Sequence, residues 1–170
     1  MSDVFNIVSR HEKVAFMGVS GADGTVIYHR MQGFTEISES KNPKEYSRKY
    51  VDEQSERSDI TGYSPSMSYA FDQIVGNKVH ECLVDIADNE KCGAAAVVAI
   101  VNVDLTKEGS TAGSFYARMR NFTVVPDGAG DEEDAYTYSG EFKANGESVR
   151  GTATTTDGWD TCVFTEDVGE

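Results

Sequence analysis

The sequence contains little proline, little cysteine and few basic residues. Of its 170 residues, three are proline, three are cysteine, and 15 lysines and arginines stand against 29 acidic residues. The scarcity of proline and a hydrophobic share of 39% argue against a disordered chain. The formal charge of −14 excludes a protein that holds a nucleic-acid backbone by neutralising its phosphates.

Long apolar runs are also missing. No stretch of about 18 apolar residues exists, so we expect no membrane-spanning helix. The first five residues lack the basic and then apolar order of a signal peptide. The cysteines Cys82, Cys92 and Cys162 are odd in number and none forms a CxxC pair. We therefore expect reduced thiols in a chain made in a cytoplasm.

Patterns typical of enzymes and metal sites are absent too. His11, His29 and His80 lie far apart and outside any HxH or HExxH arrangement. The glycines between residues 18 and 24 belong to a turn, with no helix behind them to bind a phosphate. The acidic loop over residues 126–134 leaves calcium open as an alternative, although its spacing is not that of a twelve-residue calcium loop. We expect no catalytic residue, no cofactor and no metal ion.

The acidic excess is concentrated toward the end of the chain. Residues 121–170 hold 12 acidic and two basic residues, a balance of −10, whereas residues 1–120 hold 17 and 13, a balance of −4. One interpretation is a solvated surface that aids solubility, and the other is a surface that repels an anion.

The dominant period in the chain is two, which is typical of β-strands. Lys13–Val19 and Thr25–Met31 are apolar runs joined by a glycine-containing loop, as in a hairpin. From Tyr63 to Asp72, bulky apolar residues alternate with small, mostly serine residues. Ala94–Leu105 is apolar at both sets of alternating positions, which predicts a central strand. Asn145-Gly146 predicts a further hairpin.

One segment has the period of a helix, from about residue 77 to 90. Asn77 can cap its first turn and Gly93 is expected to end it. Its apolar positions form a single stripe: Val79, Cys82, Leu83 and Ile86.

A polar stretch without a core pattern runs from about residue 39 to 58. It is either a long loop or an extended hairpin arm that leaves the domain. Together these elements predict a mainly β fold with two packed antiparallel β-sheets (a sandwich or barrel). One flanking α-helix and a long polar arm complete the expected single domain over residues 1–170.

Several stretches, in this order, carry a resemblance to a known family. They are Lys49–Glu53, Asp59–Tyr69, the helix from Asn77, Tyr138–Gly146 and Val149–Thr154. Over about residues 48–165 the chain resembles the tail tube (major tail) proteins of tailed bacteriophages. Related inner tubes occur in contractile phages, phage-tail-like bacteriocins and type VI secretion systems.

The resemblance implies a structural virion protein made in the bacterial host cytoplasm. Six copies would form a ring, inner strands would join into a β-barrel around a lumen, and rings would stack into the tail tube. DNA would pass through that lumen into the host without specific binding. Implied partners are further copies of the chain and other tail proteins (the tape measure, the tail terminator and the baseplate or distal tail protein), with no membrane.

Two sets of candidate residues follow from the resemblance. The arm would contact the adjacent ring, and small or acidic residues would face the lumen. Candidate arm contacts are Lys44, Tyr46, Arg48, Tyr50, Glu53 and Arg57. Candidate lumen-facing residues are Ser64, Ser66, Ser68, Asp131 and Glu141.

The alternative hypothesis is a monomeric β-sandwich binding module for a carbohydrate or a receptor. Such modules need exposed aromatic side chains. The candidates in this sequence are Trp159, Tyr136 and Tyr138.

Overall fold

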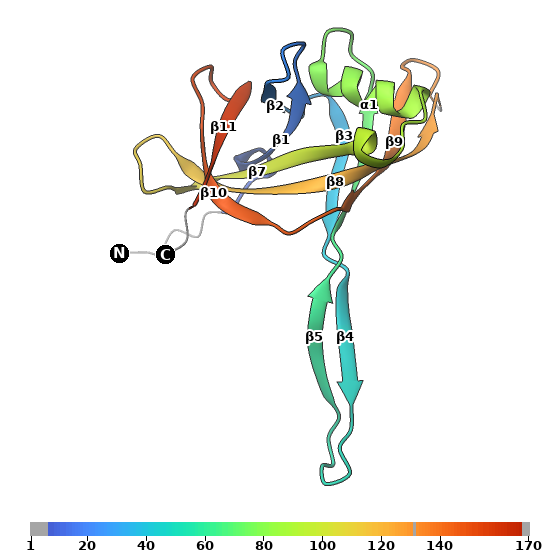
Figure 1. Ribbon diagram of the computed structural model, residues 1–170, viewed down its shortest axis with the longest axis vertical. Coiled ribbons are helices and arrows are strands. Elements are labelled where there is room, and N and C mark those ends of the chain that lie inside the picture. The colour runs from blue at the N-terminus through green and yellow to red at the C-terminus, as the bar shows by residue number, and fades with distance from the viewer. Residues whose placement is uncertain (1–6, 131, 168–170) are drawn as a thin grey trace.

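The computed structural model describes residues 7–130 and 132–167, and the fold is mainly β, as predicted. The described chain contains eleven strands, one α-helix that lies on the outside of the sheet, and two short 3-10 helices (Figure 1). The elements are η1 (Arg10–Glu12), β1 (Lys13–Ser20), β2 (Val26–Arg30), β3 (Phe34–Ser40), β4 (Pro43–Arg48), β5 (Arg57–Tyr63), β6 (Ser66–Asp72), α1 (Lys78–Asp88), η2 (Gly93–Ala96), β7 (Val97–Glu108), β8 (Phe115–Ala129), β9 (Thr137–Ala144), β10 (Val149–Thr154) and β11 (Thr161–Glu166).

Nine strands form one antiparallel sheet in the order β10-β11-β2-β1-β7-β8-β9-β6-β3. Because β10 also pairs with β8, six of these strands close into a barrel. The other three, β9, β6 and β3, extend the sheet beyond the barrel. Barrel closure removes free edges, so β3 is left as the open edge of the sheet.

Two hydrophobic cores lie on opposite faces of the shared strands. The barrel core contains Val101 and Val103 of β7, while Val98 and Ile100 of the same strand belong to the second core. Successive residues of a strand point to opposite faces, so an apolar run such as Val97–Val101 is buried on both sides. The predicted central strand is therefore confirmed, although Gly93–Ala96 form the 3-10 helix η2 ahead of it.

The helix α1 covers the second core, with Val79, Leu83 and Ile86 buried. The Asn77 side chain accepts hydrogen bonds from the amides of Val79 and His80 (3.1 and 3.2 Å), as the capping prediction requires.

The end of the helix differs from the prediction, because Gly93 does not terminate it. The chain turns at Glu90, whose φ of 48° is left-handed. There the amides of Glu90 and Lys91 donate to the carbonyls of Ala87 and Ile86 (3.3 and 3.1 Å). This is the hydrogen-bond pattern of a Schellman motif, formed here without glycine. None of the helices in the described part of the chain is long and apolar enough to cross a membrane.

Candidate functional site

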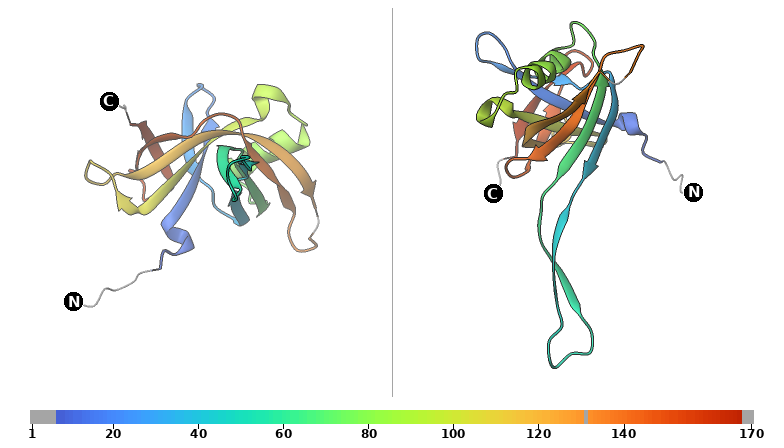
Figure 2. Two further views of the ribbon diagram at one scale, coloured as in Figure 1. Left: turned by 90° about the horizontal axis from the view of Figure 1, so that it is seen from below. Right: turned by 90° about the vertical axis from the view of Figure 1, so that its right-hand side faces the viewer.

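The arm is an antiparallel hairpin of β4 and β5 that projects away from the body of the molecule. All views agree on this projection (Figures 1 and 2). The two strands form a separate two-stranded sheet, in register from Pro43 opposite Tyr63 to Arg48 opposite Arg57. Of the two possibilities left open by the sequence, the extended hairpin is thus the one adopted.

The predicted limits of the arm are shifted along the chain. Glu39 and Ser40 pair with Met67 and Ser66 in the main sheet, so they belong to the body. Residues 59–63, which were expected to follow the arm, form five of the seven residues of β5. Tyr63, which begins the alternating stretch, lies exposed at the base of the hairpin and not with the buried apolar residues of β6.

A set of hydrogen bonds fixes the neck between the arm and the body. Asn42 is left-handed (φ 46°) and its side-chain amide donates to the Ser64 carbonyl and the Ser66 hydroxyl, both at 3.1 Å. The Ser64 amide donates back to the Asn42 carbonyl (3.3 Å). Because left-handed backbone is accessible to asparagine, this residue can turn the chain from β3 into the arm.

The arm has almost no core of its own. Every residue of β4 and all of β5 except Gly62 are exposed. Large apolar side chains are among them: Tyr46, Tyr50, Val51, Ile60 and Tyr63. A lone two-stranded hairpin is marginally stable in water. The arm therefore has the physical character of an element completed by contact with another surface.

Interactions within the arm organise its tip. The guanidinium carbons of Arg48 and Arg57 lie 5.7 and 6.0 Å from the centroid of the Tyr50 ring. Arg57 also donates through Nε to a carboxylate oxygen of Glu53 (2.9 Å), and Arg48 donates to the Tyr46 hydroxyl (3.0 Å). Five of the six predicted arm contacts thus form one cluster. Lys44 lies nearer the neck, where its carbonyl accepts from the Thr61 hydroxyl (3.2 Å).

A second feature is an uncovered face of the main sheet, which we call the polar face. On β6, Met67, Tyr69 and Phe71 are buried in the second core, so Ser66 and Ser68 point to the opposite side. Glu141 of β9 stands directly opposite Ser68, and Lys143 opposite Ser66. No helix covers this face in any view.

The lumen-facing candidates therefore divide into three groups. Ser66, Ser68 and Glu141 share the polar face. Ser64 precedes β6 and takes part in the neck instead. Asp131 lies outside the described residues.

Part of the acidic excess of residues 121–170 lies on or beside the polar face, and part lies elsewhere. Glu141 lies on that face beside Lys143. Asp127, Glu132 and Asp134 line a hollow that also includes Ala70 of β6 and Ser139 of β9, which lie on the polar side of those strands. Asp157 is in the β10–β11 loop. In the described part of the chain, no three His, Cys, Asp or Glu side chains gather as a metal ion would require.

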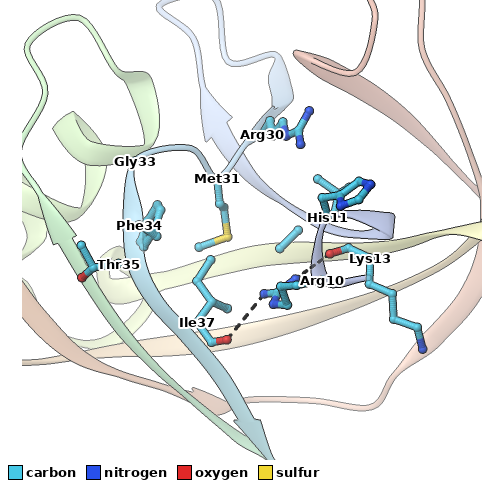
Figure 3. Close-up of a pocket in the computed structure, with 11 residues that line it drawn as sticks. Arg10, His11, Lys13, Arg30, Met31, Gly33, Phe34, Thr35 and Ile37 are labelled. Carbon is cyan, nitrogen blue, oxygen red and sulfur yellow. Dashed lines mark hydrogen bonds between the residues drawn. The ribbon is translucent and has the colours of Figure 1, made fainter. Parts of the chain in front are cut away.

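The third feature is a hollow of about 470 Å³ between η1–β1 and the open edge strand β3, which we call the basic groove (Figure 3). Arg10, His11, Lys13 and Arg30 stand around it, and no acidic residue lines it. Its apolar lining includes Met31, Phe34 and Ile37. Arg10 spans the groove by donating to the carbonyls of Lys13 (2.6 Å) and Ile37 (3.5 Å).

Sequence reasoning missed the basic groove. Its four basic side chains come from η1, β1 and the end of β2, and β3 supplies part of the lining. No local spacing connects these residues, because the curl of the sheet brings β3 back toward β1. The only available signal was that Arg10, Lys13 and Arg30 are among the few basic residues of an acidic chain.

The aromatic residues proposed for a binding module are mostly engaged inside the protein. Trp159 packs on the barrel core, with ring centroids 6.1 Å from Phe16 and 5.6 Å from Phe115. Tyr138 is buried in the second core and donates to Asp88 (3.2 Å). Tyr136 alone of the three is well exposed.

Trp159 is held in place by the loop around it. Its backbone is left-handed (φ 73°), and its amide donates to the Thr155 hydroxyl (3.0 Å). Asp157 accepts hydrogen bonds from the Thr161 hydroxyl (2.6 Å) and amide (3.0 Å). These bonds, with one from Thr155, lower the pKa of Asp157 to about 2.

No protein-family model matches this chain, and no curated protein matches it at a significant level. The features that bear on its function are the arm, the polar face and the basic groove.

Proposed function

We propose that this chain is a structural subunit that assembles into stacked rings to form a hollow tube of the phage-tail type. The observation that carries the proposal is the arm, a long hairpin with almost no buried residue that leaves a body with two cores of its own. In an isolated monomer this element would have no structural use. In stacked rings it would reach the adjacent ring.

The open edge of β3 also supports a ring. The edge of β3 has no strand partner in the described chain, and unpaired edges are sites of strand addition between copies. Closed symmetric rings use such edges without leaving one exposed. Six copies per ring is the number that the phage-tail resemblance implies.

The polar face is the surface we assign to the lumen. Its described residues include Ser66, Ser68 and Glu141 beside Lys143, so small and acidic side chains accompany the lysine and the face offers little to hold a DNA backbone. DNA would therefore slide through on its way into the host. On this proposal the protein resides in the virion tail, contacts other tail proteins and is made in the host cytoplasm.

The test is the assembly state of the purified protein and of an armless variant. Since Pro43 and Tyr63 lie opposite one another, residues 44–62 can be replaced by Asn-Gly, which closes a two-residue hairpin turn. We expect the full chain to form rings or tubes in negative-stain micrographs as its concentration rises. The armless variant should stay folded but form no long tubes.

Folding of the armless variant is checked by the melting curve of Trp159 fluorescence, since the arm contributes nothing to the barrel core. Tubes of normal length from the armless variant would show that the arm is not the stacking element. A full chain that remains monomeric at every concentration and salt would overturn the proposal.

A further inference from the structure

The basic groove and the tip of the arm are complementary in charge. The tip, residues 50–56, carries Asp52, Glu53 and Glu56, and the basic residues Arg48, Lys49 and Arg57 flank it on the two strands. Glu53 is bound to Arg57, while Asp52 and Glu56 have no ion-pair partner within the described chain. The groove presents Arg10, Lys13 and Arg30 with no acidic residue in its lining, and of these three Lys13 is already paired with Asp104 (3.8 Å). Opposite potentials of this kind select partners and set their register.

The two surfaces are also complementary in shape and polarity. The tip is convex, at the far end of a projecting hairpin (Figure 1). Val51 at that tip is fully exposed, and Tyr50 is about half exposed. The groove is concave, and Met31, Phe34 and Ile37 give it an apolar lining (Figure 3). An exposed apolar anchor with a charged surround is a common way for a loop to seat in a pocket.

The tip of a chain cannot occupy the groove of the same chain. The arm extends away from the body in every view, whereas the groove lies in the body between η1–β1 and β3. Any partner for the tip must therefore belong to another molecule.

We infer that the basic groove receives the arm tip, residues 50–56, of a second copy of this chain. Val51 and Tyr50 would lie on the apolar lining, and Asp52 and Glu56 would face Arg30 and the other basic residues at the rim. This inference rests on the proposed ring assembly and names the surface on which each arm ends. It also assigns the groove a role as a binding site, which its position beside the open strand β3 alone does not indicate.

Covalent capture tests this contact directly. Val51→Cys and Thr35→Cys place one thiol at the tip and one at the groove, in a Cys92→Ser background that removes the exposed native thiol. After assembly and mild oxidation, we expect ladders of linked chains on a non-reducing gel. The matched control pairs Val51→Cys with Glu147→Cys, an exposed position outside the groove, and should give no ladder.

Charge reversal provides a second measurement. Arg30→Glu or Glu56→Arg alone should raise the concentration needed for tubes by about tenfold or more, because like charges then face each other. The two changes together should restore assembly toward that of the unmodified chain. Arg150→Glu, the same change at an exposed arginine outside the groove, serves as the control and should leave assembly near normal.

The outcomes separate this inference from the proposed function. If the unmodified chain forms tubes but the Thr35 thiol is never linked to Val51, the groove is not the receptor. Normal assembly of Arg30→Glu would overturn the inference in the same way. If the unmodified chain forms neither rings nor tubes, the proposed function fails and this contact fails with it.

Discussion

At the scale of single residues, the most unusual environment belongs to His80. Its side chain is fully buried and stacks on Phe71, with centroids 4.3 Å apart. Nδ1 accepts from the Ile74 amide (3.1 Å), which places the proton of the neutral ring on Nε2. Nε2 has no hydrogen-bond partner within the described residues. Burial lowers the pKa of His80, and the Gln32 carbonyl and the Asp72 carboxylate oppose this only in part.

The lowered pKa predicts a loss of stability on acidification. In the unfolded chain His80 regains an ordinary pKa of about 6.5, so between its lower folded value and about 6.5 the unfolded state binds more protons. The free energy of unfolding should therefore fall as the pH drops below about 6.5. Urea unfolding at pH 7 and pH 5 measures this change.

His80→Asn is the matched variant for that measurement, because its side-chain oxygen can accept from the Ile74 amide but does not titrate. We expect it to be less stable at pH 7, since it loses the ring packing against Phe71. Its stability should change less between pH 7 and pH 5 than that of the unmodified chain. An equal change in both would show that other groups cause the acid sensitivity.

At the scale of elements, Gly151 of β10 allows the strands β10 and β11 to approach closely. A Cβ on Gly151 would meet the carbonyl oxygen of Thr165 and the Phe164 ring, whose Cζ would lie 2.6 Å away. Gly151→Ala should therefore destabilise the barrel by about 1–3 kcal/mol, the usual cost of overpacking.

Gly62→Ala is the control for this substitution. Gly62 also lies in a strand, but a Cβ there would meet nothing within 4 Å, and its φ is not in the left-handed range. Denaturant unfolding should show little change for this variant. Comparable losses from both substitutions would mean that a general cost of replacing glycine, and not the contact in the barrel, is responsible.

The same scale shows what the sequence could and could not predict. Alternation along β6 and the apolar stripe of α1 predicted most of the buried side chains, because each pattern is local. In the stripe, however, Cys82 is only partly buried, and the fully buried His80 lay outside it. The pairing of β8 with β10, which closes the barrel, depends on the three-dimensional path of the chain. The predicted end of α1 was wrong because Glu90 adopts the left-handed backbone conformation that is usually assigned to glycine. The basic groove was missed because its residues meet only after the sheet curls.

At the scale of the whole molecule, the two cores share strands and should unfold together. β1, β7 and β8 each contribute side chains to both cores. Leu83→Ala removes a fully buried side chain of the helix and should cost about 2–5 kcal/mol. The unfolding midpoint measured by Trp159 fluorescence, which reports on the barrel core, should fall together with the unfolding midpoint measured by circular dichroism.

Trp159 is the only tryptophan in the chain, so its signal reports one site. A matched reduction of side-chain volume at an exposed position, Val163→Ala on β11, should move neither midpoint by much. Two separated midpoints in Leu83→Ala would indicate that the lobe under the helix unfolds independently of the barrel.

The exposure of the arm has a consequence for measurement by hydrogen exchange. Its strands are paired with each other, but no layer covers them, so in a free chain their amides should exchange through local opening long before those of β7 or β8. Once another molecule covers the hairpin, that opening is suppressed. The amides of residues 43–63 would then slow while those of the two cores stay nearly constant, and the protein would report its own docking without any added label.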